Sequence, residues 1–227
     1  LNEQTVALLR DLSERKILAE ISQNQDKPVV ALTDGPLEVF REIQQGRFYD
    51  ERFIEYLESL LTMADRNGIA AGYVVKPRSD LTVRLLELTL LSLNERKTAG
   101  KPRNLAGVID SDLFSQILAP GQRSAIFQLQ SASSRRYKAV DPRLSLCFFY
   151  LNIGTEKHPS LARVEIPLWV AEKKEMIDLP HATLVDQCRI MGNKPYPYIL
   201  HRSHEIALVR QDEKDQVLSM LKNEMMR

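Results

Sequence analysis

The chain has 227 residues, of which 44% are hydrophobic, and it carries 31 basic against 30 acidic side chains. This length and composition predict a globular protein with a sizeable core, in one large domain or two small ones. The near-neutral charge excludes long-range attraction of DNA by the average field, so a nucleic-acid binder would need local basic groups. No segment approaches the roughly 20 apolar residues of a membrane span and no secretory signal is visible, so we expect a cytoplasmic protein with no membrane association.

The first predicted element is a helix over residues 3–23, where apolar residues recur at helical spacing. Glu14 falls between Ile17 and Ile21 on the apolar arc, and Glu20 falls elsewhere in the same broad arc. Two interpretations stay open. Each acid either lies at the border of the arc and reaches water, or leans toward a site at the strand that follows.

Residues 29–32 are a short apolar run, and such a run predicts a buried strand in the middle of a sheet. Pro36 favours the start of a helix, which we expect over residues 37–45. Asp34 would then lie at the carboxyl end of a central strand, where open α/β sheets place their ligands. Its carboxylate would either cap the helix or bind a metal ion, and the stretch alone does not separate these alternatives.

The middle of the chain predicts a helix over 50–66, a strand over 68–76 and a helix over 81–93 that Asp80 can cap. Basic residues follow the strand and occupy the loop 95–104, where they could contact a phosphate backbone or remain solvated. The residues singled out as DNA contacts are Lys76, Arg78, Lys101 and Arg103.

Residues 105–118 repeat the pattern of a strand followed by an acid and a helix. Asp112 is placed to cap that helix, and Asp110 is the better candidate for site chemistry. Two β-rich runs, 144–153 and 161–170, predict an antiparallel pair, and helices are expected from residue 171 onward.

His201 and His204 are three residues apart and so share a helix face. This spacing suits metal ligands, but the fuller zinc motifs are absent and structural histidines are the favoured interpretation of the spacing. No Walker loop or GxSxG elbow occurs, which argues against a P-loop ATPase and an α/β-hydrolase. The fold class we predict is α/β, a mixed sheet flanked by helices with additional antiparallel strands and C-terminal helices.

Several segments in order along the chain resemble the NurA nuclease family: TDGPLEVF at 33–40, GYVVKPRSD at 72–80, VIDSDLF at 108–114, LAPGQRSAIF at 118–127, CFFYL at 147–151, ARVEIPLWVAE at 162–172 and YPYILHRSHEIALV at 196–209. The resemblance implies an RNase H-like core and a toroidal homodimer. It also implies a DNA nuclease, a 5′–3′ exonuclease or single-strand endonuclease dependent on Mn²⁺, or on Mg²⁺ in its place. The implied partner in DNA end resection is a HerA-type hexameric translocase.

The resemblance also assigns site residues. Asp34 is similar to the later Asp of the family's acidic set, and Glu14 to its helical Glu, with Glu20 as second choice. Tyr150 and His204 resemble the family's downstream active-site Tyr and His. The implied metal ligands are Asp34, Glu14 and His204, and oxygen ligands of this kind suit Mn²⁺ and Mg²⁺.

One departure from the family lies at the start of the chain. The family opens with a strand that ends in Asp-Gly-Ser, and nothing before residue 28 matches it. We therefore expect residues 1–227 to be a single NurA-type nuclease domain that is truncated at its N-terminus. The alternative is a non-catalytic DNA clamp or adaptor that docks on the hexameric translocase. The helices at 50–66 and 81–93 are the expected sources of a dimer interface.

Overall fold

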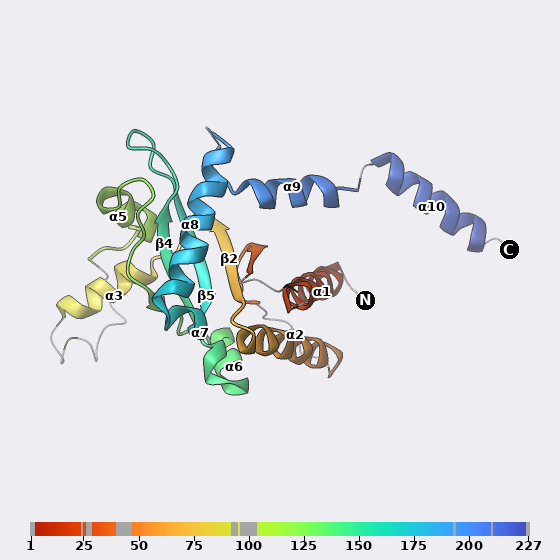
Figure 1. Ribbon diagram of the computed structural model, residues 1–227, viewed down its shortest axis with the longest axis horizontal. Helices are drawn as coiled ribbons and strands as arrows, with labels where there is room; N and C mark the ends of the chain where they lie inside the picture. Colours follow the sequence, from red (N-terminus) through yellow and green to blue (C-terminus); the bar gives the residue numbers. More distant parts are fainter. Residues whose placement is uncertain are drawn as a thin grey trace.

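A computed structural model describes residues 3–23, 25, 29–39, 47–91, 95, 104–192, 194–209 and 211–225. Figure 1 shows a mixed sheet flanked by helices, and the strands are β1 Val30–Asp34, β2 Ile69–Val75, β3 Phe127–Gln128, β4 Leu146–Asn152 and β5 Leu161–Pro167. The helices are α1 Glu3–Gln23, α2 Arg47–Asp65, α3 Leu81–Leu90, α5 Asp110–Ile117, α6 Ala132–Val140, the 3-10 turn η1 Pro142–Leu144, α7 Leu168–Ala171, α8 Lys174–Ile190, α9 Tyr198–Ala207 and α10 Gln211–Met225.

The five strands form one sheet in the order β1-β2-β5-β4-β3. Only β1 and β2 run parallel, and the other neighbours are antiparallel. The antiparallel pair of β4 and β5 confirms the prediction from the two β-rich runs. Every residue of β4 is buried, so this strand forms the centre of the core.

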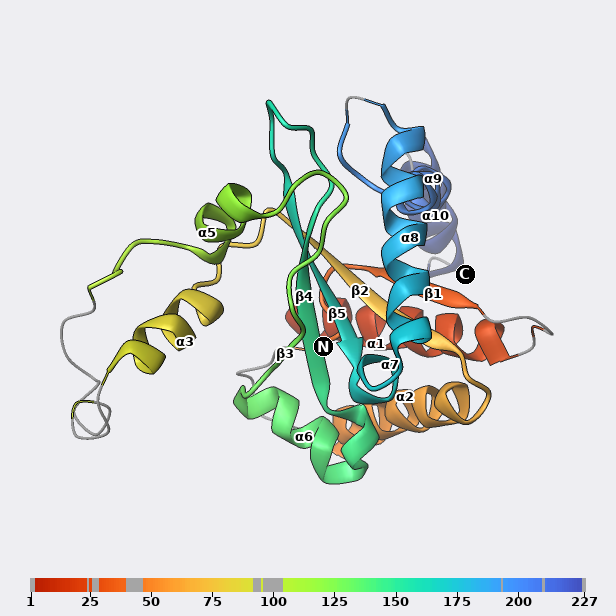
Figure 2. The ribbon, with the colours of Figure 1, turned by 60° about the vertical axis from the view of Figure 1, so that its left-hand side comes forward.

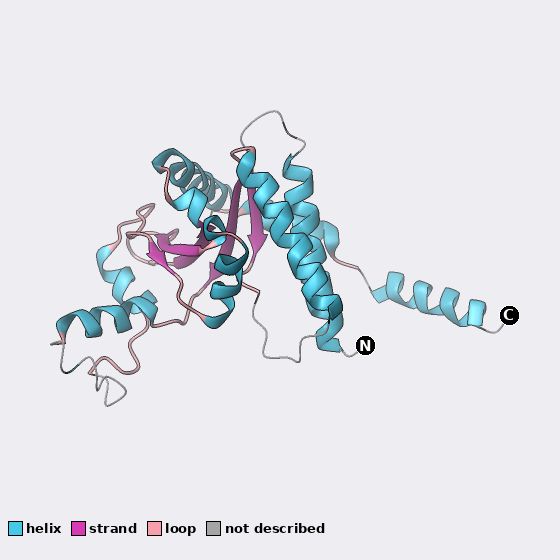
Figure 3. Ribbon diagram, turned by 90° about the horizontal axis from the view of Figure 1, so that it is seen from below, coloured by secondary structure: helices cyan, strands magenta, loops and turns pink. Residues whose placement is uncertain are grey.

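The register divides the sheet into two faces, because residues directly opposite one another share a face. Asp34 lies opposite Tyr73 of β2, which lies opposite Val164 of β5. Figure 2 shows α8 in front of this face. Figure 3 shows the sheet beside the long helices α1 and α2, which lie next to each other. These two helices and α6 pack on the opposite face, where Tyr56 of α2 interacts with Glu165.

Helix α2 buries its apolar side toward the core. Phe53, Tyr56, Leu57, Leu60 and Met63 are all nearly inaccessible to solvent. Because this stripe is buried in the core, it is not available as a dimer interface. Of the two helices expected to supply a dimer interface, α3 is the one that exposes a row of leucines.

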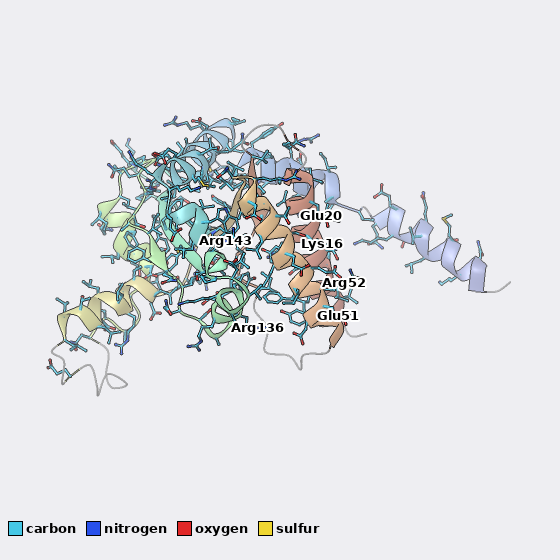
Figure 4. The ribbon with its side chains drawn as sticks, turned by 60° about the horizontal axis from the view of Figure 1, so that its bottom comes forward. Lys16, Glu20, Glu51, Arg52, Arg136 and Arg143 are labelled. Carbon is cyan, nitrogen blue, oxygen red and sulfur yellow. The ribbon has the colours of Figure 1, made fainter. Side chains whose placement is uncertain are left out.

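Ion pairs between charged side chains link the helices that cover this face of the sheet. Several of these side chains are labelled in Figure 4. Lys16 Nζ lies 2.8 Å from Glu55 Oε2, so one ion pair links α1 to α2. Arg136 of α6 lies 2.9 Å from Asp50 and places its guanidinium 4.7 Å from the ring centroid of Phe53. The cation–π contact and the ion pair attach α6 to α2 through Arg136.

Three predictions of local structure are wrong. Residues 36–39 are not helical: the Leu37 carbonyl, which a helix would use as an acceptor, accepts instead from the Tyr137 hydroxyl at 2.8 Å, and Glu38 N donates to Glu165 Oε2. Strand β1 lies at an edge of the described sheet, not in its middle. Residues 104–107 form turns where a strand was expected.

The last two helices lead away from the sheet, and α10 projects beyond the rest of the described chain (Figure 1). This extension exposes apolar side chains, namely Ile206 in α9, Leu208 and Val209 after it, and Val217 and Leu218 in α10. No helix in the described ranges is long and apolar enough to cross a membrane.

Candidate functional site

The carboxyl ends of β1 and β2 meet at one edge of the sheet because the two strands are parallel. Asp34 is the last residue of β1 and its side chain is exposed. Gly35 N donates to the carbonyl of Tyr73 at 2.9 Å, which turns the chain over β2. Gly72 permits this turn, since a Cβ there would lie 2.6 Å from Leu37 N. Residues 36–39, which are described, are not helical, so they offer Asp34 no helix to cap.

Tyr196 comes to Asp34 from the other end of the chain. It lies between Pro195 and Pro197, and its N–H donates to Lys194 O at 2.8 Å, so the backbone here is tightly held. Burial raises the pKa of Tyr196, and a hydrogen bond to Asp34 raises it further. A hydroxyl that keeps its proton at neutral pH is a donor, so Tyr196 orients the Asp34 carboxylate.

The ring of Tyr196 is fixed from two further directions. It meets the ring of Tyr73 edge-on, with centroids 5.7 Å apart. The ammonium of Lys194 lies 5.9 Å from the Tyr196 centroid. Because Lys194 is exposed, the site combines one carboxylate, one phenol and one cation that can reach solvent.

Helix α9 begins two residues after Tyr196 and contacts β1, so its side chains lie at the same end of the sheet. His204 is exposed. His201 Nε2 lies 3.4 Å from Glu205 Oε1, and a hydrogen bond from Arg202 lowers the pKa of Glu205. Helix α9 leads away from the sheet, and no contact between either histidine and Asp34 is found among the described residues.

Helix α1 is tied to the same turn, since Arg15 donates to the carbonyl of Pro36 at 2.8 Å. The neighbouring Glu14 is exposed and its carboxylate lies 3.5 Å from Arg10. Glu20 lies 3.8 Å from Lys16 on the surface shown in Figure 4. Each of these two acids is thus paired with a cation of its own helix.

Lys76 and Arg78 are exposed and follow β2, so they lie at the same edge of the sheet as Asp34. Lys76 has a φ of 45°, a left-handed backbone that marks a sharp turn at the strand end. Lys101 and Arg103 lie outside the described residues.

Tyr150 lies on the other face of the sheet, opposite Arg163 and separated from β1 by β5 and β2. Three strand spacings place it about 14 Å from Asp34. Its hydroxyl donates to Asp110 Oδ2 at 2.6 Å, and burial raises the pKa of Tyr150. The structure does not bring Tyr150 together with Asp34.

Asp110 itself is fully buried and has a structural task. Its Oδ1 accepts from Thr82 N and Val83 N, both at 2.9 Å, so it caps the first turn of α3 from a distant part of the chain. Asp80, the residue predicted to cap this helix, makes no side-chain capping bond. Asp110 is therefore a capping residue, not a group open to substrate.

Within the described ranges, no three His, Cys, Asp or Glu side chains gather in a way that could hold a metal ion. Asp34 supplies one carboxylate and Tyr196 one hydroxyl. Mg²⁺ and similar ions require several oxygen ligands in regular geometry, so the described side chains alone do not fit such an ion.

The five-stranded mixed sheet with helices on both faces defines a mixed α/β protein consistent with an RNase H-like fold. The family model of the NurA domain matches residues 1–209, and the chain belongs to the NurA family. The crystal structure of the NurA nuclease from Sulfolobus solfataricus is similar, with a TM-score of 0.55 and 12% identity over 100% of this chain and 69% of that chain. None of the curated proteins matches.

Sequence reasoning missed Tyr196, although the stretch that contains it was part of the resemblance. The local signal is a tyrosine held between Pro195 and Pro197 immediately before a helix that carries two histidines. The two prolines restrict the backbone on both sides of Tyr196. Tyr150, in contrast, lies within a continuous apolar run, which indicates burial.

Proposed function

We propose that this chain is a metal-dependent DNA nuclease of the NurA type, formed by residues 1–227 as a single nuclease domain. The observation that carries the proposal is the pairing of Tyr196 with Asp34 at the carboxyl end of β1, in a chain of this family. The similar structure from Sulfolobus solfataricus is itself called a nuclease, which supports the same assignment.

The proposed roles follow from the groups present. Asp34 interacts with Tyr196 and is exposed, so its carboxylate is open to a water or a ligand. His204 is exposed on the adjacent helix and is assigned to proton transfer or to contact with the scissile phosphate. Tyr150 keeps the role implied by the resemblance only as a weaker proposal, because it lies on the opposite face.

The family implies a divalent ion, and we propose Mn²⁺, or Mg²⁺ in its place, with Asp34, Glu14 and His204 as ligands. Such an ion, if held by these residues, would supply charge stabilisation and an activated water in phosphodiester cleavage. The side chains described here do not assemble that ligand set, so the roles given to Asp34 and Tyr196 are stated without it.

The proposed substrate contacts and partners complete this function. Lys76 and Arg78 lie at the site edge and are assigned to DNA phosphates, together with Lys101 and Arg103. We propose a homodimer that encloses DNA, with a HerA-type hexameric translocase as partner in end resection. The exposed apolar residues of α9 and α10 are better candidates for an interface than the buried stripe of α2.

The test is degradation of end-labelled DNA with Mn²⁺, with and without a chelator. Asp34→Asn should lose about a hundredfold or more in rate, because it removes the charge at the site. Asp186→Asn is the matched control, since Asp186 is an exposed carboxylate of α8 paired only with Arg189 of its own helix among the contacts described. Equal rates for wild type and Asp34→Asn would remove Asp34 from the mechanism.

A second function is favoured by one observation, the lack of a three-ligand metal group in the described ranges. It is a non-catalytic clamp that holds DNA and docks on the hexamer. DNA binding that persists with no cleavage by the wild type, at any divalent ion tested, would support the clamp over the nuclease.

A further inference from the structure

A second concave site lies on the face of the sheet opposite Asp34. It is a cavity of about 540 Å³ between α3 and the β3 edge, with Leu81 and Leu85 on one side and Phe127 and Phe148 on the other. Figure 2 shows α3 on the β3 side of the sheet. Phe148 lies opposite Glu165, which lies opposite Gly72, so the cavity is on the face that Asp34 does not share.

One wall of this cavity is a free strand edge. Phe127 lies opposite Phe148, and Leu129 N donates to the carbonyl of Leu146 at 2.8 Å. Main-chain groups alternate in direction along a strand, so the N–H and C=O of Gln128 point away from β4. Within the described ranges no strand pairs with this side of β3.

The floor of the cavity carries polar groups that lack partners. The Thr82 hydroxyl and Arg163 Nε are buried and have no hydrogen-bond partner among the described residues. Both residues line the cavity. Both atoms are inaccessible from the cavity, so the choice of occupant rests on the free main-chain groups of β3 and on the apolar wall.

We propose that the cavity and the β3 edge together bind an extended peptide segment of a partner protein, added as a strand beside Gln128. Side chains of a strand alternate, so the occupant presents apolar residues at positions i and i+2 to the leucines of α3 and to Phe127. The volume lies within the usual range for a ligand site. A lipid chain would use the apolar wall but not the main-chain edge, and for this reason we assign a peptide.

The probe is a short fluorescent peptide of alternating leucine and threonine with terminal lysines, measured by anisotropy with the full chain. We expect saturable binding and slowed amide exchange at Gln128. Gln128→Pro deletes the outward N–H and should weaken binding by about tenfold or more, because Pro is tolerated at an edge strand only where its N–H was free. Gln128→Ala keeps the main-chain groups and should bind like wild type.

Two further arms separate a strand from non-specific apolar binding. A peptide N-methylated at alternate residues keeps its side chains but lacks N–H donors, and it should bind at least about tenfold more weakly. Leu85→Glu, a change at a half-exposed side chain, should also abolish binding without unfolding the chain. Equal binding of the methylated peptide, equal binding by Gln128→Pro, or no binding up to about 1 mM would each overturn the proposal. Because the cavity faces away from Asp34, the result is independent of nuclease activity.

Discussion

Tyr196 interacts with Asp34, since burial and hydrogen bonding to the Asp34 carboxylate raise the pKa of the Tyr196 hydroxyl, and this interaction joins the last third of the chain to the end of its first strand. The phenol is held by the ring of Tyr73 and by the flanking prolines, so it acts as a fixed donor. A donor held in place before substrate binds does not need to reorganise during the reaction.

Tyr196→Phe should retain the fold and lose DNA cleavage by about 10- to 100-fold, the effect expected for one hydrogen bond to a charged group. The measurement is the initial rate on labelled DNA with saturating Mn²⁺. Tyr198→Phe is the matched control, because Tyr198 is partly exposed at the start of α9. An unchanged rate for Tyr196→Phe would show that the bond does not matter for turnover.

Asp110→Ala should destabilise the protein by about 2–4 kcal/mol, since it removes the cap of α3 and leaves the buried Tyr150 hydroxyl short of an acceptor. Chemical unfolding measures this change. Asp112→Ala removes only an exposed hydrogen bond to Ile109 N and should cost about 1 kcal/mol or less. Equal losses for the two variants would contradict the structural role of Asp110.

Gly72→Ala should cost about 1–3 kcal/mol and also reduce DNA cleavage, because the added Cβ displaces Leu37 N and Gly35 O beside Asp34. Gly107→Ala is a useful comparison. Gly107 has a φ of 91° with open space around it, so the change costs about 1–2 kcal/mol in backbone strain and should leave cleavage unchanged. Loss of cleavage in both variants would point to general destabilisation instead.

Glu165 should make the stability of the protein fall as pH rises. Burial raises the pKa of this carboxyl, although Arg163 opposes the shift from 2.6 Å away. The folded chain therefore binds the proton more tightly than the unfolded chain. The free energy of unfolding decreases from the ordinary glutamate pKa upward to the raised value in the folded state.

Glu165→Gln tests this linkage, because it removes the titrating group and keeps the size of the side chain. The difference between the wild-type and variant unfolding curves, recorded at a series of pH values, isolates the contribution of Glu165 from that of other groups. The wild type should show the steeper loss with rising pH. Parallel curves would mean that the proton affinity of Glu165 is the same in both states.

The sequence predicted elements whose signal is local. Helix α1 was predicted over the range the structure shows, and the pair of β4 and β5 follows from two β-rich runs separated by a short connection. Where distant residues decide, prediction failed. Pro36 favoured a helix locally, but Glu165 and Tyr137 bind main-chain groups that follow it. Asp80 had the better local position for a cap, yet Asp110 provides it.

The candidate site divides in the same way. The position of Asp34 at the end of a strand could be predicted, because an acid directly after an apolar run is a local signal in the sequence. Its partner could not, since the contact with Tyr196 depends on how α8 and α9 cross the sheet. The apolar run 29–32 also cannot distinguish a central strand from an edge strand, because one buried face is enough to require apolar residues.

The outer edge of β1 has a consequence for handling the protein. No described strand pairs with it, so main-chain donors and acceptors run along it up to Asp34. Edges of this kind recruit strands from neighbouring molecules, and Val30 and Leu32 add partly exposed β-branched and apolar surface. Aggregation during expression should therefore begin at β1.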